Sequence, residues 1–415
     1  MIPAIPDDAP LGTRPTIGMV VPALAGGGGV PAVADFLCTQ IERAGRYTLR
    51  IFSLATSSRD DCSLRLRAPH SWLGAPRSRT GLWNGRPYTH FGATAAEFEF
   101  QRYGTRSPLT RALRECDLIQ VVAGSPAAAL CASKCDRPVV LQVATLIATE
   151  RASAVSQSTA TMRWWREAMM RVTSELDDRA LATVDAIMVQ NEWMLKYARE
   201  RSAGLGRVVK SPPGVDCEAY TPLADRKPQV QQHPYILFVG RFADPRKNLT
   251  LLCAAYSDLV SRMPDPPRLI LAGHEDLPVP AAALLARCPD QARIRIVRSP
   301  SARELRSLYQ HAACLALPSH EEGFGMVVIE AMASGIPVVA TRCGGPEEII
   351  DEGETGYLVP LDDAKQLASR LELLCTEASQ NVAMGLRARA QVELRYSATA
   401  AFQPFAQIYD YLLNR

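Results

Sequence analysis

The chain has 415 residues, and since a typical domain has roughly 150, two domains are a better expectation than one. Apolar residues make up 47% and charged residues 21% of the chain, which excludes a disordered, collagenous or coiled-coil protein. No uninterrupted apolar run reaches the ~18 residues of a transmembrane helix. Residues 1–14 contain acids and prolines without an apolar stretch, so we expect a flexible arm there and no signal peptide.

The formal net charge of +3 is too small to indicate nucleic acid as the main partner. Residues 1–223 carry 26 Lys and Arg against 21 Asp and Glu, whereas residues 224–415 carry 20 against 22. Residues 59–114 alone contain ten Arg and four acids. Two interpretations stay open: a solvated Arg-rich face, or attraction to an anionic membrane surface or an anionic acceptor. We expect a cytoplasmic protein, either free or peripheral to the inner face of the membrane.

Metal and covalent chemistry receive no support from the sequence. The eleven cysteines show no CxxC spacing, so we expect reduced, mostly buried thiols and neither a disulfide framework nor a zinc site. No Asp-x-Asp, His-x3-His, Ser–His–Asp or Cys–His arrangement is evident in the sequence. We therefore expect no metal and no permanently bound cofactor.

The first half of the chain follows the order of a doubly wound α/β domain. A buried strand at Thr16–Pro22 leads through the glycine loop Gly26–Gly29 into an amphipathic helix over Val33–Arg43. Apolar residues at helical spacing predict a long helix over Thr161–Leu181. Further strands are predicted at Leu49–Leu54, Leu118–Val122, Val139–Val143 and Ala186–Val189.

A second alternation of strands and helices follows a turn at Ser211–Gly214 and a polar, proline-containing segment. We predict an N-terminal domain over 15–222, a linker over 223–234, a second domain over 235–395 and a C-terminal helix over 396–415. The fold class is α/β, with two Rossmann-like doubly wound domains facing across a cleft. The strands of the second domain are predicted at Tyr235–Val239, Arg268–Ala272, Arg293–Val297, Cys314–Leu317 and Pro337–Ala340.

The most informative stretch is LPSHEEGFGMVVIEAMASGIPVVAT, which begins at Leu317. It predicts a strand, a tight glycine turn and a helix over Met326–Ala333, whose backbone N–H groups and positive dipole end suit a phosphate. Glu322 precedes this helix, and the six residues from Phe324 to Glu330 span roughly 9 Å of it. One carboxylate can then hold sugar hydroxyls and the other a ribose diol, with a diphosphate between them. The alternative is a strand–turn–helix corner with two solvated glutamates.

This stretch resembles the donor site of the retaining glycosyltransferase family 4, whose members have the two-domain GT-B fold. The similarity is dense from Tyr235 to Pro360, and looser in the N-terminal half. The resemblance implies a UDP- or GDP-type nucleotide-diphosphate sugar, bound mainly by the C-terminal domain, and an acceptor hydroxyl bound mainly by the N-terminal domain. It also implies transfer with retention, and a C-terminal helix that returns to the N-terminal domain.

A second matching block starts at Val239 and places Arg241 and Lys247 on one loop. In the family such residues contact the donor diphosphate and stabilise the leaving group, Arg as a planar fork and Lys as a compact charge. Arg246 is an alternative for the lysine role, and a solvated basic turn capped by Asn248 is the alternative for the whole block. The resemblance implies that Arg241, Lys247 and Glu322 are catalytic. The donor-binding residues it implies are Gly28, Gly29, Arg241, Lys247, Arg298, Ser299, Glu322, Gly323, Phe324, Gly325, Met326, Val327 and Glu330.

One departure concerns the donor sugar. Many family members have a histidine just after the strand that corresponds to Pro138–Val143, and it contacts the sugar near O6. None follows here before Glu150, and the six histidines lie elsewhere. Gln142 and Thr145 are the candidates for this contact and for the acceptor side. A hexosyl- or deoxyhexosyltransferase is therefore expected.

Two other function classes stay open on the same fold. One is a sugar-nucleotide epimerase or hydrolase, and the other is a non-catalytic sugar-nucleotide binding protein. The sequence names neither the nucleotide base nor the acceptor, which can be a lipid, a polysaccharide or a small metabolite.

Overall fold

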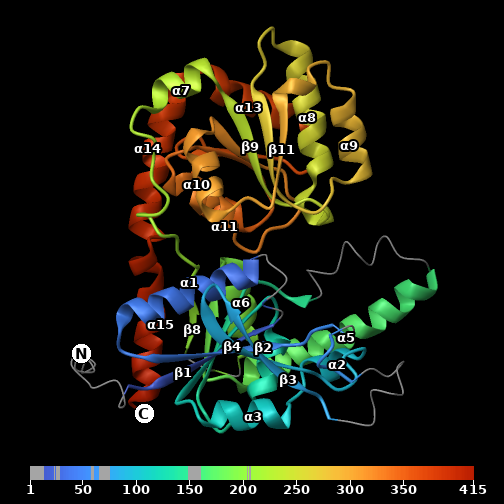
Figure 1. The fold of residues 1–415 in the computed structure, drawn as a ribbon, viewed down its shortest axis with the longest axis vertical. Helices are drawn as coiled ribbons and strands as arrows, with labels where there is room; N and C mark the ends of the chain where they lie inside the picture. The colour runs from blue at the N-terminus through green and yellow to red at the C-terminus, as the bar shows by residue number, and fades with distance from the viewer. Residues whose placement is uncertain are drawn as a thin grey trace. The chain divides into compact units, whose positions relative to one another are not determined.

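A computed structural model describes residues 14–22, 24, 29–57, 60–64, 75–147, 160–202, 204 and 207–415 of the chain (Figure 1). Of the predicted glycine loop, Gly26–Gly28 lie outside the described residues, whereas Gly29 begins the first helix. The chain divides into two compact units. Unit 1 contains the described residues up to Pro213 together with Ala401–Arg415, and unit 2 contains Gly214–Ala400.

Unit 1 is built on an eight-stranded sheet in the order β3-β4-β2-β1-β5-β6-β7-β8. Neighbouring strands pair in parallel except β3 and β4, which form an antiparallel hairpin at one edge. The strands are β1 (Thr16–Pro22), β2 (Thr48–Leu54), β3 (Ser78–Trp83), β4 (Arg86–Phe91), β5 (Leu118–Ala123), β6 (Val139–Val143), β7 (Ala186–Val189) and β8 (Val208–Lys210).

Helices cover both faces of this sheet, so β1 is apolar on both sides, as parallel sheets require. Met19 and its neighbours on one face pack against α1 and α15, and Val20 packs on the opposite face in the core that contains α3 and α6. The helices are α1 (Gly29–Ala44), α2 (Glu99–Arg102), α3 (Ser107–Arg114), η4 (Pro126–Ala132), α5 (Ala160–Thr183), α6 (Glu192–Arg201) and α15 (Ala398–Leu413).

The C-terminal helix α15 packs into unit 1, as predicted. The Tyr409 hydroxyl donates to Gln120 Oε1 at 2.8 Å, beneath the sheet. Asp410 accepts from the Tyr47 hydroxyl at 2.5 Å and from Arg46 at 3.1 Å. The last residues of the chain therefore complete the core that the first strand and helix begin.

The β3–β4 hairpin was not predicted, although the sequence carries its signal. Asn84 and Gly85 join the two strands with φ angles of 49° and 77°. A two-residue Asn-Gly turn with both φ angles positive is the preferred connection of a hairpin. The hairpin matters because its second strand, β4, places His90 at its carboxyl end, beside the carboxyl end of β2.

Unit 2 carries a six-stranded, all-parallel sheet in the order β11-β10-β9-β12-β13-β14. The predicted strands are all present, with bounds that differ by at most two residues; β14 and the helices α13 and α14 were not predicted. The strands are β9 (Tyr235–Arg241), β10 (Arg268–His274), β11 (Ile294–Arg298), β12 (Cys314–Leu317), β13 (Val338–Thr341) and β14 (Gly356–Val359).

Two apolar layers enclose this sheet. Ile236 and Phe238 face the core formed with α8, α9 and α13, whereas Tyr235 and Leu237 face the core formed with α10, α11 and α14. This alternation follows from the period of two along a strand. The helices are α7 (Arg226–Gln232), η5 (Pro245–Lys247), α8 (Leu249–Arg262), α9 (Val279–Ala286), η6 (Gln291–Arg293), α10 (Ala302–His311), α11 (Met326–Ala333), α12 (Gly345–Ile349), α13 (Ala364–Thr376) and α14 (Ala378–Arg395).

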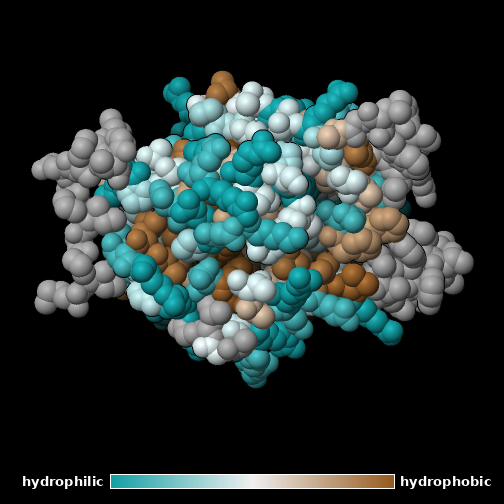
Figure 2. Space-filling view, turned by 90° about the horizontal axis from the view of Figure 1, so that it is seen from below, coloured by the Kyte–Doolittle hydropathy of each residue, from teal (hydrophilic) through white to brown (hydrophobic). Residues whose placement is uncertain are grey.

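The cysteines and the surface agree with the composition. All eleven cysteines are free thiols, and all except Cys217 are buried. Among the helices in the described part of the chain, none is both long and apolar enough to cross a bilayer. Figure 2 shows one face of the molecule, on which hydrophilic residues predominate around scattered hydrophobic patches.

Candidate functional site

The residues predicted to bind the donor gather at one edge of the unit 2 sheet. Since the strands are parallel, their carboxyl ends meet at a single edge, which is where ligands bind in open α/β sheets. β9 ends at Arg241, β11 ends at Arg298, and β12 ends at Leu317, just before the glutamate motif. The fold therefore places all three predicted loops on the same side of the sheet.

Lys247 and Glu322 form the centre of this edge. Lys247 Nζ lies 2.5 Å from Glu322 Oε1, and the Ser319 hydroxyl donates to the same oxygen at 2.7 Å. The two charged side chains are 17% and 11% exposed, so the ion pair is shielded from solvent but still reachable. Both bonds end on Oε1, which leaves the second carboxylate oxygen able to accept from a ligand.

Asp244 organises the basic loop that carries Lys247. Its carboxylate accepts two bonds from the Arg246 guanidinium, at 3.1 and 2.9 Å, and one from Arg241 at 2.6 Å. Burial alone would raise the pKa of Asp244, but the hydrogen bonds and charge of Arg246, followed by the charge of Arg241, lower it below its usual value. Arg246 thus faces Asp244 and Lys247 faces Glu322, while Arg241 keeps 41% of its side chain exposed.

The glycine turn is held by a second glycine pair that the sequence analysis did not single out. The Glu322 N–H donates to the Cys343 carbonyl, and the Gly345 N–H donates to the Glu322 carbonyl, both at 2.8 Å. A Cβ on Gly345 would lie 2.3 Å from the Phe324 carbonyl oxygen. Only glycine fits this close backbone approach, so Gly345 fixes the position of the 322–325 turn.

The turn delivers the start of α11 to the same edge. Gly325 caps the helix with φ of 100°, a conformation that costs little only for glycine. The first N–H groups of a helix have no partner within it, so those of Met326 and Val327 suit an anion. Phe324 is only 5% exposed and packs edge-on against Tyr396, so its side chain belongs to the core and its backbone alone faces the turn.

Glu330 is held by two tyrosines that the sequence analysis missed. The Tyr309 hydroxyl donates to Glu330 Oε2 at 2.8 Å, and Tyr220 hydrogen-bonds the same carboxylate. The residue keeps some exposed surface, but burial of the carboxyl group raises the pKa of Glu330 to about 7, against the lowering effect of both tyrosine hydroxyls. Glu330 is therefore fixed in direction, and its carboxyl group titrates closer to neutral pH than an ordinary glutamate does.

Arg298 and Ser299 stand apart from this centre, at the end of β11. Ser299 has a φ of 49°, its N–H donates to Gly273 and its hydroxyl lies 3.0 Å from His274 Nδ1. Arg298 pairs with Asp276 at 2.8 Å and keeps 54% of its side chain exposed. Two strands of the sheet, β10 and β9, separate this loop from the glutamate motif. This spacing suits the nucleotide base of a donor, which lies some distance from its diphosphate.

The acceptor-side candidates belong to unit 1. Gln142 has no exposed surface, and its amide donates to the Ser211 carbonyl at 3.3 Å. The Thr145 N–H donates to the Gly124 carbonyl, and its side chain is 8% exposed. Both residues are therefore buried in unit 1, Gln142 completely and Thr145 almost completely.

Comparison with known proteins gives a family match within unit 2 and a fold for the whole chain. Residues 233–377 match the family model described as Glycosyl transferases group 1. A D-inositol 3-phosphate glycosyltransferase of Corynebacterium urealyticum is 32% identical over 217 residues, 49% of this chain and 51% of that protein. A phosphatidyl-myo-inositol mannosyltransferase of Mycolicibacterium smegmatis is 31% identical over 206 residues, 49% of this chain and 51% of that protein. The chain thus matches about half the length of each of these curated relatives.

Solved structures extend the likeness over nearly the whole chain. Sucrose-phosphate synthase from Thermosynechococcus elongatus superposes with a TM-score of 0.71 at 20% identity, covering 97% of this chain and 100% of that one. HepE of Anabaena in complex with UDP-glucose gives a TM-score of 0.69 at 15% identity, covering 95% and 99%. The chain therefore has the GT-B fold that the sequence motifs predicted.

Proposed function

We propose that this chain, with a Glycosyl transferases group 1 domain over 233–377 on the GT-B fold, is a glycosyltransferase. It moves a sugar from a nucleotide-diphosphate sugar to an acceptor hydroxyl, with retention at the anomeric carbon. The observation that carries the proposal is the contact between Lys247 and Glu322 beside the start of α11. A cation, a carboxylate and free backbone N–H groups at one sheet edge match the diphosphate, the sugar hydroxyls and the phosphate oxygens of such a donor.

The proposed chemistry uses the charge that develops on the departing diphosphate. As the bond from the anomeric carbon to the phosphate oxygen breaks, Arg241, Lys247 and the first N–H groups of α11 stabilise the leaving group. The same phosphate accepts the proton of the acceptor hydroxyl, whose oxygen bonds to the anomeric carbon from the side the phosphate leaves. Glu322 orients the sugar through its hydroxyls, and Glu330 holds the ribose diol. The basic residues meet the diphosphate charge, so we propose that the reaction needs no metal.

Substrates to test first come from the proteins this chain is similar to. HepE binds UDP-glucose, and the two sequence relatives are named for inositol phosphate and phosphatidyl-inositol acceptors. We therefore propose UDP- or GDP-sugars as donors, and a phosphorylated polyol, free or within a lipid headgroup, as acceptor.

Donor turnover tests the proposal. A transferase hydrolyses its donor slowly alone and faster when an acceptor is added, an epimerase converts the donor alone, and a binding protein does neither. Lys247→Met should lower transfer by about 10²–10³-fold, whereas Lys365→Met, an exposed lysine on α13, should leave it unchanged. EDTA should not affect the chemical step; a strict Mg²⁺ requirement would contradict cation-assisted departure by Arg241 and Lys247.

Peripheral contact with an anionic membrane is part of the same proposal. Among the arginines of residues 59–114, Arg86 pairs with Asp35 and Glu42, and Arg106 is buried on backbone carbonyls. The exposed Arg77 and Arg111 remain for an anionic surface. Sedimentation with phosphatidylserine vesicles should be salt-sensitive; no binding at low salt would leave only the solvated-face interpretation.

A further inference from the structure

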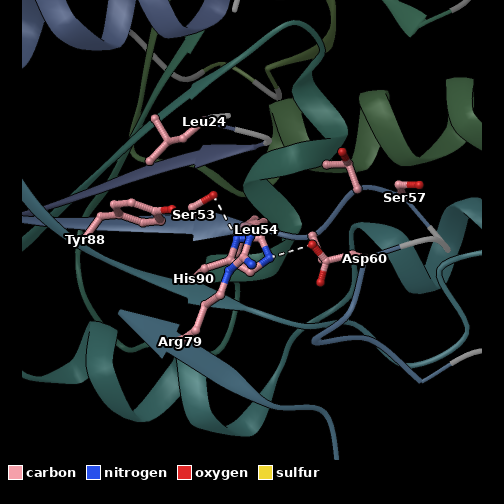
Figure 3. Close-up of a pocket in the computed structure, with 10 residues that line it drawn as sticks. Leu24, Ser53, Leu54, Ser57, Asp60, Arg79, Tyr88 and His90 are labelled. Carbon is pink, nitrogen blue, oxygen red and sulfur yellow. Dashed lines mark hydrogen bonds and ion pairs between the residues drawn. The ribbon is translucent and has the colours of Figure 1, made fainter. Parts of the chain in front are cut away.

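A pocket of about 140 Å³ lies in unit 1, where β2 and β4 end side by side (Figure 3). One water needs only ~10–15 Å³ of such space, so this pocket has room for a ligand with a single ring. Ser53 of β2 and His90 of β4 are register partners in the parallel pair, which brings both side chains to the pocket floor. Nothing in the proposed donor chemistry uses these residues.

The residues at the floor of the pocket form a hydrogen-bonded chain from Ser53 through His90 to Asp60, which the sequence analysis did not detect. His90 Nδ1 lies 3.0 Å from the Ser53 hydroxyl, and His90 Nε2 lies 2.9 Å from Asp60 Oδ2. The sequence alone does not show this Ser–His–Asp arrangement, because His90 is 37 positions from Ser53 and 30 from Asp60 and meets them only in the folded chain. The Cys62 N–H donates to Asp60 Oδ1 at 2.9 Å, so both carboxylate oxygens are held in place.

This hydrogen-bonded chain presents the Asp60 carboxylate to the cavity and not a nucleophile. Ser53 is 2% exposed and His90 is 5% exposed, whereas the Asp60 side chain keeps 17% of its surface. Burial, ahead of the opposing charge and hydrogen bond of Asp60, lowers the pKa of His90, so the imidazole is neutral and forms no charged pair with Asp60. A fixed carboxylate with remaining lone pairs is a hydrogen-bond acceptor for hydroxyl groups.

The other residues that line the pocket provide an apolar surface and a cation. Leu24, Leu54 and the ring of Tyr88 give an apolar surface, as Figure 3 shows. Arg79, on β3, is the cross-strand partner of His90 and is exposed; it forms no ion pair with the part of the chain that the structure describes. A carboxylate, an apolar wall and an unpaired guanidinium together suit a hydroxylated ring that carries an anionic substituent.

We propose that this pocket binds a small polyhydroxylated ring with an anionic group, such as a hexose phosphate or a cyclitol phosphate. Asp60 accepts from ring hydroxyls, Arg79 pairs with the anion, and Tyr88 covers the apolar face of the ring. His90 is a positioning residue that holds Asp60. The inference rests on the proposed function in one respect: we assign this ligand as the sugar acceptor.

A metal ion is the competing occupant. Asp60, Cys62 and His90 place one ligand atom each within 4.8 Å of one another. However, His90 and Asp60 already satisfy each other at 2.9 Å, and Cys62 does not line the pocket. Burial, the largest cause, raises the pKa of the Cys62 thiol, which disfavours the thiolate that zinc would require. The geometry therefore favours the hydroxylated ligand.

Ligand-observed NMR tests the pocket without any donor. The probes are a panel of hexose and cyclitol phosphates, the parent unphosphorylated compounds, and inorganic phosphate. At least one phosphorylated ring should bind, and Asp60→Asn should weaken it by about tenfold or more, as expected for loss of a charged partner. Arg79→Gln should weaken the phosphorylated ring to the level of its parent compound. Arg199→Gln, an exposed arginine on α6, is the matched control and should change neither.

The positioning role of His90 is tested by a measurement that a purely structural role would not change. His90→Gln, whose amide can replace one ring hydrogen bond, should retain more affinity than His90→Ala, while UDP binding to unit 2 stays equal in both. Equal ring affinity in the two variants would overturn the positioning role.

Two further outcomes separate the proposals. If donor turnover is observed but no ring of the panel binds, or binding ignores Asp60 and Arg79, the pocket assignment is wrong and the proposed function stands. If rings bind through these residues but no donor is turned over, the pocket stands and the proposed function fails. Zinc bound in one equivalent and lost in Cys62→Ser would overturn the pocket assignment in favour of a metal site.

Discussion

Lys247 Nζ and Glu322 Oε1 lie 2.5 Å apart, although the two residues are separated by 75 positions in the chain. The contact joins the loop after β9 to the loop after β12, so the two motifs that the sequence predicts separately form one site. Each residue neutralises the other in the structure without a ligand. A donor diphosphate must therefore compete with Glu322 for the ammonium group, and sugar hydroxyls must share Glu322 with Lys247.

This competition gives a prediction for Glu322→Gln. The substitution removes the counter-charge of Lys247, so the ammonium group is free for a diphosphate and UDP or GDP should bind at least as tightly as in the wild type. Turnover should nevertheless fall by about 10²–10³-fold, since the sugar loses a charged contact at the reacting centre. Calorimetry with the nucleotide and a transfer assay measure the two effects; a parallel loss of both would instead indicate a damaged fold.

Tyr220 and Tyr309 should control donor affinity through their hydrogen bonds to Glu330. Both hydroxyls lower the pKa of this carboxylate, so Tyr309→Phe should raise that pKa further and reduce the charged fraction at pH 7. Since a charge-assisted hydrogen bond contributes roughly 1.5–3 kcal/mol, nucleotide affinity should fall about tenfold at pH 7 and recover at pH 9. Tyr256→Phe, another buried tyrosine whose hydroxyl bonds the Pro267 carbonyl, is the control. An equal loss at both pH values would show a purely structural role.

The raised pKa of Glu330 also sets the sign of a stability effect. The folded-state value of about 7 lies above the ordinary 4.5, so the folded chain binds more protons than the unfolded chain between these values. The stability from this group is complete below pH 4.5 and is lost as pH rises through about 7. The difference in Tm between Glu330→Gln and the wild type should therefore shift in favour of the variant as pH rises from 5 to 8. A difference that is constant across this range would place the carboxyl group in contact with water.

Gly345 should be intolerant of any side chain. A methyl group there would lie 2.3 Å from the Phe324 carbonyl, so Gly345→Ala must move the 322–325 turn. Overpacking of this kind costs about 1–3 kcal/mol, and nucleotide binding should fall with it. At Gly353 an added Cβ meets open space, so Gly353→Ala carries only the cost of positive φ and should leave nucleotide binding intact. Chemical denaturation and nucleotide titration of both variants measure the difference.

The donor sugar offers the last test. The resemblance to glycosyltransferase family 4 implies a histidine contact with O6 that this chain lacks, and Gln142, one candidate to replace it, is enclosed in the core. A site without a group that bonds a hydroxyl loses discrimination against sugars that lack it. A 6-deoxy donor should therefore be used at least as well as its 6-hydroxy parent, by kcat/KM on one acceptor. A preference for the hydroxyl donor above about 100-fold would mean that Thr145 or another residue has rebuilt the contact.

Local pattern was sufficient for much of this protein. The strands β1, β6, β7 and β12 and the helix α11 begin and end where apolar runs, glycine turns and helical spacing predict, and α15 does so within two residues. The buried parallel strands are apolar on both faces, which makes them visible as short continuous runs. The donor motifs were equally legible, because glycines, basic residues and glutamates lie close together in the chain.

The tertiary structure decided which residues meet. Nothing in the sequence pairs Tyr220 and Tyr309 with Glu330, or His90 with Ser53 and Asp60, since these partners lie at least 21 positions apart and meet only in the folded chain. The charge state of an acid likewise depends on the folded structure. Burial raises the pKa of Glu330, whereas Arg246 and Arg241 lower the pKa of Asp244. Desolvation and partner charge depend on packing, and so they enter only when the chain is folded.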